Sequence, residues 1–540
     1  MKQLVACLTV GLLAVPAAAQ TKLLASNGMP GDNYGQGVAI EGDLAVVGAP
    51  EADPVFGGEG IIYVYERTAT GWVETAQLIP GDPQLVQLLG FDVDVSGDLI
   101  VGGADFDGLV QGNPIVGAAY VFRRTGGVWG QVAKLKPGDL SSIQFFAHRV
   151  AVDGVTVLGS STGDPTLGQS AGAVYVFREV AGAFTQIDKL FASDGAAFDE
   201  FGYSLDMSGD TIVVGSRGDD DLGSGSGAVY VFREVGGVFT QVAKLTASDG
   251  AGGDEFGSSV AIEGSRVVVG STGADNGAPG SNRGAAYVFD EVGGVWTETA
   301  KLTASTAVNF DFLGKVVALD GDLVVVGSEE ADAQSANPTF NLGAAYVFAN
   351  VAGPGMAPKW VELKRLTAPD GGQGDLFACS VGASDGAVLC GMFRDDDLGT
   401  DAGAAYVFDA CRPLSASGRT VSEQGGSVGF TLAAGPSNGG RSYALLGGIS
   451  GALPGTALPG ASVVLPLNVD GFTTGVVLPA MNTPTFAGFL GALGPTGSAQ
   501  AQLNVPPLPP GLVGLQMEYA YLLVGPTDFA SNAVPVVIVP

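Results

Sequence analysis

Two runs of aspartate are the residues in this sequence whose type and spacing most directly suggest chemistry. Asp219-Asp220-Asp221 and Asp395-Asp396-Asp397, the second followed by Asp401, place carboxylates side by side. Adjacent carboxylates repel each other unless a cation neutralises them, so one interpretation is a divalent-cation site. The other is a solvated acidic loop, which is the commoner meaning of a charge run. The spacing does not match a twelve-residue calcium loop, and the sequence leaves both interpretations open.

The sequence gives little support for catalysis. His148 is the only histidine, and it follows Phe145-Phe146-Ala147 without a serine or cysteine motif nearby. There is no zinc motif, Cys-x-x-Cys pair or phosphate loop. We therefore assign no catalytic, cofactor-binding or metal residue and expect a protein that is not an enzyme. Arg217-Gly218-Asp219, the tripeptide that integrins bind, is interpreted as a chance match in a glycine- and aspartate-rich chain.

Three cysteines follow the N-terminal apolar segment: Cys379, Cys390 and Cys411. The first two flank the Asp385-Gly386 turn and lie on the same face of the expected hairpin, so a disulfide and a pair of buried thiols are equal alternatives. The odd number leaves at least one cysteine unpaired within the chain.

The elements that must position these residues belong to a repeat. A Tyr-Val-aromatic triplet recurs every 55 to 60 residues, with its tyrosine at Tyr63, Tyr120, Tyr175, Tyr230, Tyr287, Tyr346 and Tyr406. A unit repeated seven times buries its core by stacking on its neighbours.

Each copy predicts four short antiparallel strands. Around Tyr230, Lys189-Leu190 precedes the alternating segment 203–207, the β-branched run 212–214 and the segment 229–232, separated by Gly, Asp and Ser turns. No window of helical length has helical periodicity. Four strands per repeat are typical of a propeller blade, so the fold class is all-β with a seven-bladed propeller.

Two apolar positions keep the repeat register. A large residue followed by Gly or Ala, as in Phe201-Gly202, predicts a side chain wedged between blades. Six of the seven outermost strands carry an aromatic residue for which we expect burial between blades rather than an exposed sugar platform. These residues are Trp72, Trp129, Phe184, Phe239, Trp296 and Trp360.

The ends of the repeat region predict how the ring closes. The outer-strand motif appears first at Lys22-Leu23, before the rest of the first blade, while the last copy stops at Tyr406-Val407-Phe408. We therefore expect Lys22 to Ala25 to be the fourth strand of the last blade, which removes exposed sheet edges.

At this point the chain resembles a known family. Phe-Gly followed by Val47-Gly48-Ala49-Pro50 is similar to the FG-GAP repeat of the integrin α-subunit propeller, and the closer likeness is to bacterial FG-GAP repeat proteins. The resemblance covers residues 22 to about 410. Integrin blades bind calcium in the loop between their first two strands, but here that connection is a tight turn such as Ser208-Gly209-Asp210. Because a turn this short cannot surround an ion, we expect no calcium at these turns.

Composition predicts an extracellular location. Lys2, the apolar residues 4–15 and Ala17-Ala18-Ala19 resemble a secretory signal cleaved after Ala19. No later stretch is apolar enough to cross a membrane. The net charge is −31, of which residues 412–540 carry only −1, and an acidic propeller disfavours nucleic acid as a partner.

A change in composition near Cys411 predicts the domain organisation: a signal peptide at 1–19, a propeller at 20–411 and a C-terminal β-sandwich-like domain at 412–540. Seven strands are expected in the last domain, at 428–432, 443–446, 462–467, 473–478, 500–503, 515–522 and 534–539. The domain resembles a module of secreted bacterial proteins in which segments like 440–443 and 530–532 recur.

We expect a secreted or cell-surface binding scaffold that presents propeller loops to a protein or glycan. The alternatives are a propeller hydrolase acting on polysaccharide, since any of the 55 acidic residues could line the channel, and a purely structural component of the cell exterior.

Overall fold

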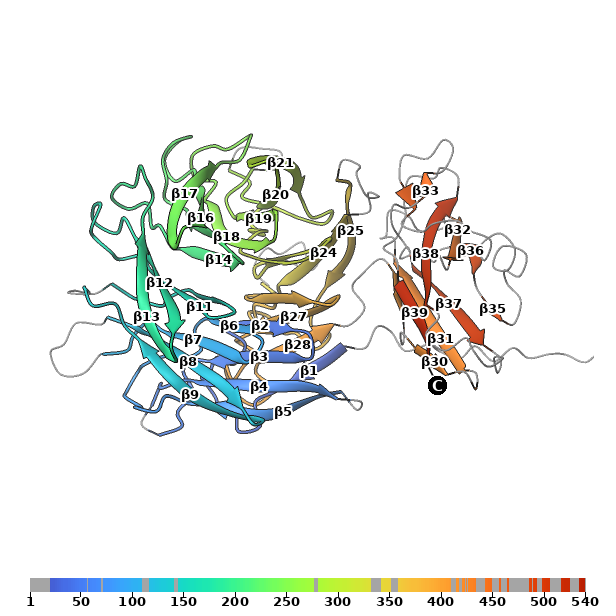
Figure 1. Cartoon of the computed structure of the whole chain (residues 1–540), viewed down its shortest axis with the longest axis horizontal. Helices are drawn as coiled ribbons and strands as arrows, with labels where there is room; N and C mark the ends of the chain where they lie inside the picture. Colours follow the sequence, from blue (N-terminus) through green and yellow to red (C-terminus); the bar gives the residue numbers. More distant parts are fainter. Residues whose placement is uncertain are drawn as a thin grey trace, which may run out of the picture.

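The propeller repeats form seven four-stranded antiparallel sheets. The computed structural model describes residues 20–408, apart from 56, 69–70, 109–115, 140–143, 276–279, 332–340 and 351–357, together with parts of 414–539. Figure 1 shows the sheets arranged around a common centre, with the C-terminal strands as separate sheets. The predicted seven-bladed propeller of four-stranded blades is confirmed.

Each blade runs from an inner strand at the centre to an outer strand at the rim. The inner strands are β2 (Val38–Glu41), β6 (Val93–Ser96), β10 (Val150–Asp153), β14 (Ser204–Ser208), β18 (Phe256–Glu263), β22 (Val316–Asp320) and β26 (Val381–Ser384). The second strands are β3 (Leu44–Ala49), β7 (Leu99–Ala104), β11 (Thr156–Ser161), β15 (Thr211–Ser216), β19 (Arg266–Ser271), β23 (Leu323–Ser328) and β27 (Ala387–Met392).

The third strands contain the Tyr-Val-aromatic triplets. They are β4 (Ile61–Thr68), β8 (Ala118–Thr125), β12 (Ala173–Val180), β16 (Ala228–Val235), β20 (Ala285–Val292), β24 (Ala344–Asn350) and β28 (Ala404–Phe408). The outer strands are β5 (Gly71–Leu78), β9 (Val128–Leu135), β13 (Ala183–Leu190), β17 (Val238–Leu245), β21 (Val295–Leu302), β25 (Trp360–Leu366) and, for the seventh blade, β1 (Gln20–Leu23).

Burial explains the sequence of each strand. The second strand of blade 4, β15, is buried at all six positions, as expected for a β-branched run covered on both faces by neighbouring blades. The outer strand β13 is mostly exposed or half-buried, and its polar residues face water. The core is therefore a series of interblade layers: one apolar cluster, for example, joins Leu158 and Val174 of blade 3 to Phe201 and Tyr230 of blade 4.

The ring closes through β1 as predicted. All four residues of β1 pair with β28, and Lys22 lies opposite Tyr406. The strand covers residues 20–23 rather than 22–25. Closure gives the last blade the same four-stranded sheet as the others, because β1 pairs with the edge of β28 that would otherwise be exposed.

The Phe-Gly positions are wedged between blades, as predicted. Phe201 is fully buried, and its backbone forms a parallel bridge with Gly172 of the preceding blade. A Cβ on Gly172 would lie 2.1 Å from the Phe201 carbonyl oxygen, so only glycine fits there. The Phe201 ring contacts Tyr230 edge-on, with centroids 5.6 Å apart.

The C-terminal residues form small sheets of their own. One contains β29 (Leu414–Ala416), β31 (Gly426–Ala433), β37 (Ser498–Val505) and β35 (Phe486–Ala487). The other contains β30 (Thr420–Ser422), β39 (Val534–Val539), β38 (Gln516–Val524), β32 (Ser442–Gly448) and β36 (Leu490–Ala492). A two-stranded sheet joins β33 (Thr456–Ala457) and β34 (Val464–Leu465).

The two larger C-terminal sheets contact each other through Phe430 and Tyr519, whose ring centroids are 5.0 Å apart, as in a sandwich. Five of the predicted strands match β31, β32, β37, β38 and β39, and β34 covers two residues of the one predicted at 462–467. The strand predicted at 473–478 lies outside the described residues.

Candidate functional site

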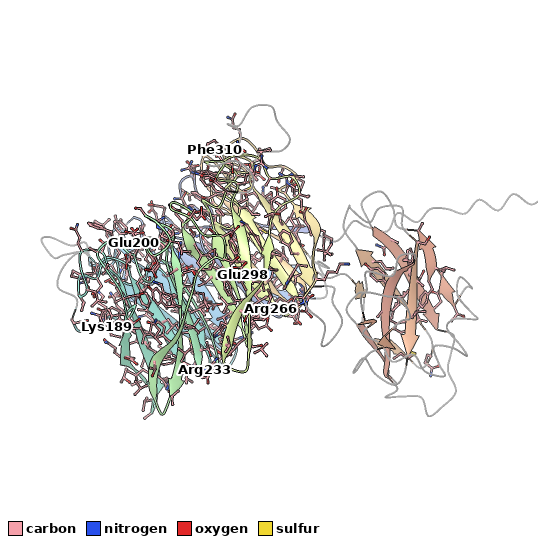
Figure 2. All side chains as sticks on the ribbon, turned by 90° about the horizontal axis from the view of Figure 1, so that it is seen from above. Lys189, Glu200, Arg233, Arg266, Glu298 and Phe310 are labelled. Atoms are coloured by element: carbon pink, nitrogen blue, oxygen red, sulfur yellow. The ribbon has the colours of Figure 1, made fainter. Side chains whose placement is uncertain are left out.

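The two faces of the propeller differ in their loops. One face carries the loops between the second and third strands and the loops that lead from blade to blade, and we call it the long-loop face. The opposite face carries the tight turns between the first and second strands and between the third and outer strands. Figure 2 shows Phe310, on a long loop, near one edge of the propeller and Arg233, beside a tight turn, near the opposite edge.

The first aspartate run encloses one of the protein's own ammonium groups. Nζ of Lys244, on β17, lies 2.8 Å from Asp194, 2.8 Å from Asp219 and 2.6 Å from Asp221. Tyr230 donates its hydroxyl proton to Asp194 and Asp219, both at 2.8 Å. The three carboxylates are close enough together to hold a metal ion, but the lysine occupies the position between them.

Electrostatics agree with this geometry. Burial alone would lower the pKa of Lys244, but hydrogen bonds to the three aspartates outweigh it and raise the pKa. Burial would likewise raise the pKa of Asp194, but Lys244 and Tyr230 lower it. Burial and the neighbouring carboxylates raise the pKa of Tyr230, which keeps its hydroxyl protonated as a donor. The cluster is therefore an internal ion-pair network with an ammonium group in place of a metal.

The second aspartate run repeats the arrangement at the point of ring closure. Nζ of Lys22, on β1, lies 3.0 Å from Asp370, 2.8 Å from Asp395 and 2.6 Å from Asp397. The middle residue, Asp396, instead accepts a hydrogen bond from the backbone N–H of Asp401. The closing strand thus contributes a lysine to an acidic cluster as well as four backbone pairs.

The same network recurs elsewhere with fewer carboxylates. In blade 3, Lys189 contacts Asp139 at 2.7 Å and Asp164 at 2.9 Å, and in blade 5 Lys301 contacts Asp249 at 2.8 Å. The sequence showed the lysine of the outer strand, the tyrosine of the triplet and the aspartate of the Ser-Asp-Gly turn as separate motifs. All three motifs recur in the same register of the repeat, and this was the signal from which their contact could have been predicted.

The tight turns between the first two strands form a hydrogen-bonded ring. In the first six blades the residue before the turn glycine accepts a hydrogen bond from the glycine N–H of the next blade, and in the seventh the acceptor is Ser384, two residues before Gly386. Glu41 accepts from Gly97 at 2.6 Å, and Ser384 of the last blade accepts from Gly42 of the first at 2.9 Å. The other acceptors are Ser96, Asp153, Ser208, Glu263 and Asp320. The acidic residues of these turns therefore join neighbouring blades.

The inner strands of all seven blades line a central cavity of about 300 Å³. Asp94 and Asp206 face it from blades 2 and 4, and each accepts two backbone N–H groups, one from the following blade. Burial raises the pKa of Asp206 to about 7, and burial together with Asp206 raises the pKa of Asp94. These carboxylates bridge blades in a partly dehydrated channel.

The other candidate residues have structural partners. His148 Nδ1 lies 2.9 Å from Asp105, and its ring lies beside Phe91 with centroids 4.8 Å apart. Cys379 and Cys390 are buried free thiols, so the disulfide alternative does not form. Burial raises the pKa of Cys379 to about 12, which keeps the thiol protonated and unreactive. Cys411 lies outside the described residues.

The Arg-Gly-Asp tripeptide is part of the blade. The Arg217 guanidinium stacks on Tyr203 at 3.7 Å and donates to Glu200 at 2.6 Å. Asp219 is 4% exposed and binds Lys244. The tripeptide is therefore not presented as an exposed recognition sequence.

The outer-strand aromatics pack between blades, but to different depths. Phe239 is 6% exposed and belongs to the apolar layer between blades 3 and 4. Trp129 and Trp296 are half-buried. Trp129 packs against the apolar layer between blades 1 and 2, and Trp296 packs against the layer between blades 4 and 5. Phe184 of blade 3 is also only half-buried, so among these six residues Phe239 alone is fully within its layer.

Exposed phenylalanines are the feature of the long-loop face that the sequence analysis missed. Phe198 is 60% exposed and Phe310 is 54% exposed, each on the loop leading to an inner strand. The same position, three residues before the wedged residue, is glycine in three other blades and Val86 and Ile143 in the remaining two; the glycines are Gly31, Gly253 and Gly374. A phenylalanine at a loop position that is glycine in three of the seven blades was the signal that the sequence offered.

The comparisons with known proteins agree with this architecture. A family model described as the FG-GAP repeat matches seven segments, at residues 18–65, 72–122, 129–177, 184–232, 239–289, 296–348 and 360–408. These segments cover more than half of the chain, and each contains the outer strand of one blade followed by the first three strands of the next. The chain therefore belongs to the FG-GAP repeat family, whose β-propeller is a fold commonly used for binding. Among curated proteins, no match was found.

Proposed function

We propose that this protein is a binding scaffold at the cell exterior, secreted or attached to the surface, and that its long-loop face contacts a protein or glycan partner. The observation that carries this proposal is the set of large apolar side chains exposed on long loops, with more than half of each side chain accessible. These residues are Met29, Val55, Leu85, Phe198 and Phe310. Apolar side chains on loops held by a rigid ring are typical of binding surfaces.

Other features support the same proposal. The N-terminal segment resembles a secretory signal. Within the described part of the chain, no helix is long and apolar enough to cross a bilayer. The acidic clusters, the histidine and Cys379 make contacts within the chain. In the described part of the propeller the opposite face exposes valines such as Val292, whereas the exposed methionine, leucine and phenylalanine side chains lie on the long loops.

A polysaccharide hydrolase is the second candidate. The raised pKa values of Asp94 and Asp206 in the central cavity favour it, because a general acid needs such a pKa. Both carboxylates, however, already accept two backbone N–H groups. Product analysis on mixed polysaccharides, comparing the wild type with Asp206→Asn, tests this alternative.

Arrays of glycans and of extracellular proteins, probed with the labelled full chain with and without calcium, test the scaffold proposal. We expect selective binding that is lost when Met29, Leu85, Phe198 and Phe310 are replaced together by serine or glycine. The matched control is Val292→Ser on the opposite face, where the valine is 78% exposed. Binding to no ligand would favour a purely structural role, and equal loss in the control would contradict the assignment of the face.

A further inference from the structure

Phe198 and Phe310 have a backbone conformation that bulky residues rarely adopt. Their φ angles are 72° and 70°, in the left-handed region. At the same loop position Gly31, Gly253 and Gly374 have φ angles of 86°, 84° and 89°, and the half-buried Val86 has a φ angle of 55°. The conformation is required because the residue's N–H binds the preceding blade: Phe198 donates to the Gln169 carbonyl at 2.8 Å, and Phe310 donates to Ser281 at 2.9 Å.

Neither phenylalanine adds a hydrogen bond or a buried side chain that glycine at the same position would lack. Glycine satisfies the same hydrogen bond without steric strain, and more than half of each phenylalanine side chain is in water. A strained backbone combined with an exposed ring points to a contact outside the chain. The two residues lie on blades 4 and 6, on either side of blade 5, where Gly253 occupies the position.

The surroundings of these rings are acidic. The long loops of blades 4 to 6, at residues 191–203, 217–227, 246–255, 272–284, 303–315 and 329–343, contain fourteen acidic and three basic residues. Lys244 and Lys301 of the outer strands pair with four of these acidic residues, and the others keep the loops acidic.

A cavity of about 170 Å³ lies between blades 5 and 6, and three carboxylates and one lysine line it together with Thr272 and Phe312. The carboxylates are Glu255, Glu329 and Glu330, and the lysine, Lys315, lies 3.5 Å from Glu329, so the lining keeps a surplus of negative charge. Phe312 lies beside Phe310, with centroids 6.2 Å apart, so the acidic cavity adjoins the exposed ring.

We propose that the long-loop face of blades 4 to 6 binds a basic polypeptide segment. Its apolar side chains pack against Phe198 and Phe310, and a lysine or arginine side chain enters the acidic cavity beside Phe312. This inference rests on the proposed function and names its partner class. A second copy of a chain with a net charge of −31 would be repelled, and a neutral glycan would make no use of the surplus carboxylates.

Synthetic decapeptides and the full chain test the proposal by fluorescence anisotropy at physiological salt. The probes alternate lysine with leucine, lysine with serine, or glutamate with leucine. We expect the lysine–leucine peptide to bind at least tenfold more tightly than the lysine–serine peptide, because only the former uses the rings. The glutamate–leucine peptide should not bind.

Phe198→Gly combined with Phe310→Gly should abolish the preference for leucine. Glycine suits both backbone conformations, so this variant should retain its melting temperature. Val292→Ser, on the opposite face, should bind like the wild type. Glu255→Gln combined with Glu329→Gln should weaken both lysine peptides to a similar degree, since it removes charge and spares the rings.

Equal binding of the lysine–leucine peptide by the wild type and the double glycine variant would overturn the proposal. If a neutral glycan or a second copy binds instead, and the double glycine variant loses that binding, the basic partner is wrong but the binding scaffold stands. If no probe and no array ligand responds to changes in the long loops, both proposals fail.

Discussion

At the residue scale, the lysines of the outer strands give the acidic loops their stability. Lys244 lies among three carboxylates that would repel one another without it, and Asp219 among them is almost completely buried. A buried charge that loses its partner is strongly destabilising, whereas an exposed pair contributes little. We therefore expect the loss of stability on replacing a lysine to increase with the number of carboxylates around it.

Lys244→Ala should destabilise the propeller by about 2–4 kcal/mol, because three carboxylates lose their cation. Lys301→Ala, which removes a single pair with an exposed Asp249, should cost about 1 kcal/mol and is the matched control. Calcium should then raise the melting temperature of the Lys244 variant more than that of the wild type. Equal melting temperatures for the two variants would show that the cluster does not act as described.

The raised pKa of Asp206 predicts that the stability of the protein depends on pH. Burial raises its pKa to about 7 in the folded protein, so the folded state binds a proton more tightly than the unfolded chain does. Proton binding by Asp206 therefore adds to the free energy of unfolding. This stabilisation is fully present at pH values below the pKa of the carboxyl group in the unfolded chain, near 4, and is lost as the pH rises towards 7. Melting curves from pH 4 to 8 should show stability falling by roughly 1–3 kcal/mol over this window, with a smaller fall in Asp206→Asn. A wild-type profile that rises with pH would contradict this.

At the element scale, the outer-strand aromatic should matter in proportion to its burial. Phe239→Ala should cost about 3–4 kcal/mol, since it opens a cavity between blades 3 and 4, while the half-buried Trp296→Ala should cost about 2 kcal/mol. Denaturant unfolding of the full chain measures both. The reverse order would indicate that the indole has a role besides packing.

The closing strand β1 is the other element whose contribution can be measured. Deleting residues 22–26 should lower the melting temperature by several degrees, because the deletion removes strand pairing, the buried Leu23 and the Lys22 cluster together. A synthetic peptide of residues 20–27 should restore part of the loss, and the same peptide with Lys22→Ala should restore less. An unchanged melting temperature in the deletion would disprove closure by this strand.

At the scale of the whole molecule, the ring is joined by the chain's own groups. Seven hydrogen bonds between neighbouring turns and the lysine-centred clusters take the places where related propellers of the integrin type bind calcium or where the sequence suggested a cation. We therefore expect excess chelator to leave the melting temperature of the wild type unchanged. A drop on addition of EDTA that calcium reverses would show that a metal contributes to the ring.

The repeat period alone predicted most of the fold. Seven blades, four strands per blade, the wedged Phe-Gly positions and closure by the N-terminal strand all follow from motifs that recur in one register, because strand alternation and turn residues act locally. A motif repeated in register also packs in the same way each time. For this reason Phe201 and its counterparts could be placed in the core without a structure.

Only the tertiary structure decided what the polar residues do. Lys22 and Asp395 lie 373 positions apart in the sequence and meet because the ring closes, and no local pattern distinguishes an aspartate that binds a metal from one that binds a lysine. The tertiary structure also decided which phenylalanines are buried: Phe198 and Phe201 are three residues apart, and the first is exposed while the second is buried. Their difference comes from the left-handed backbone at Phe198, which directs one ring towards water while the other enters the layer between blades.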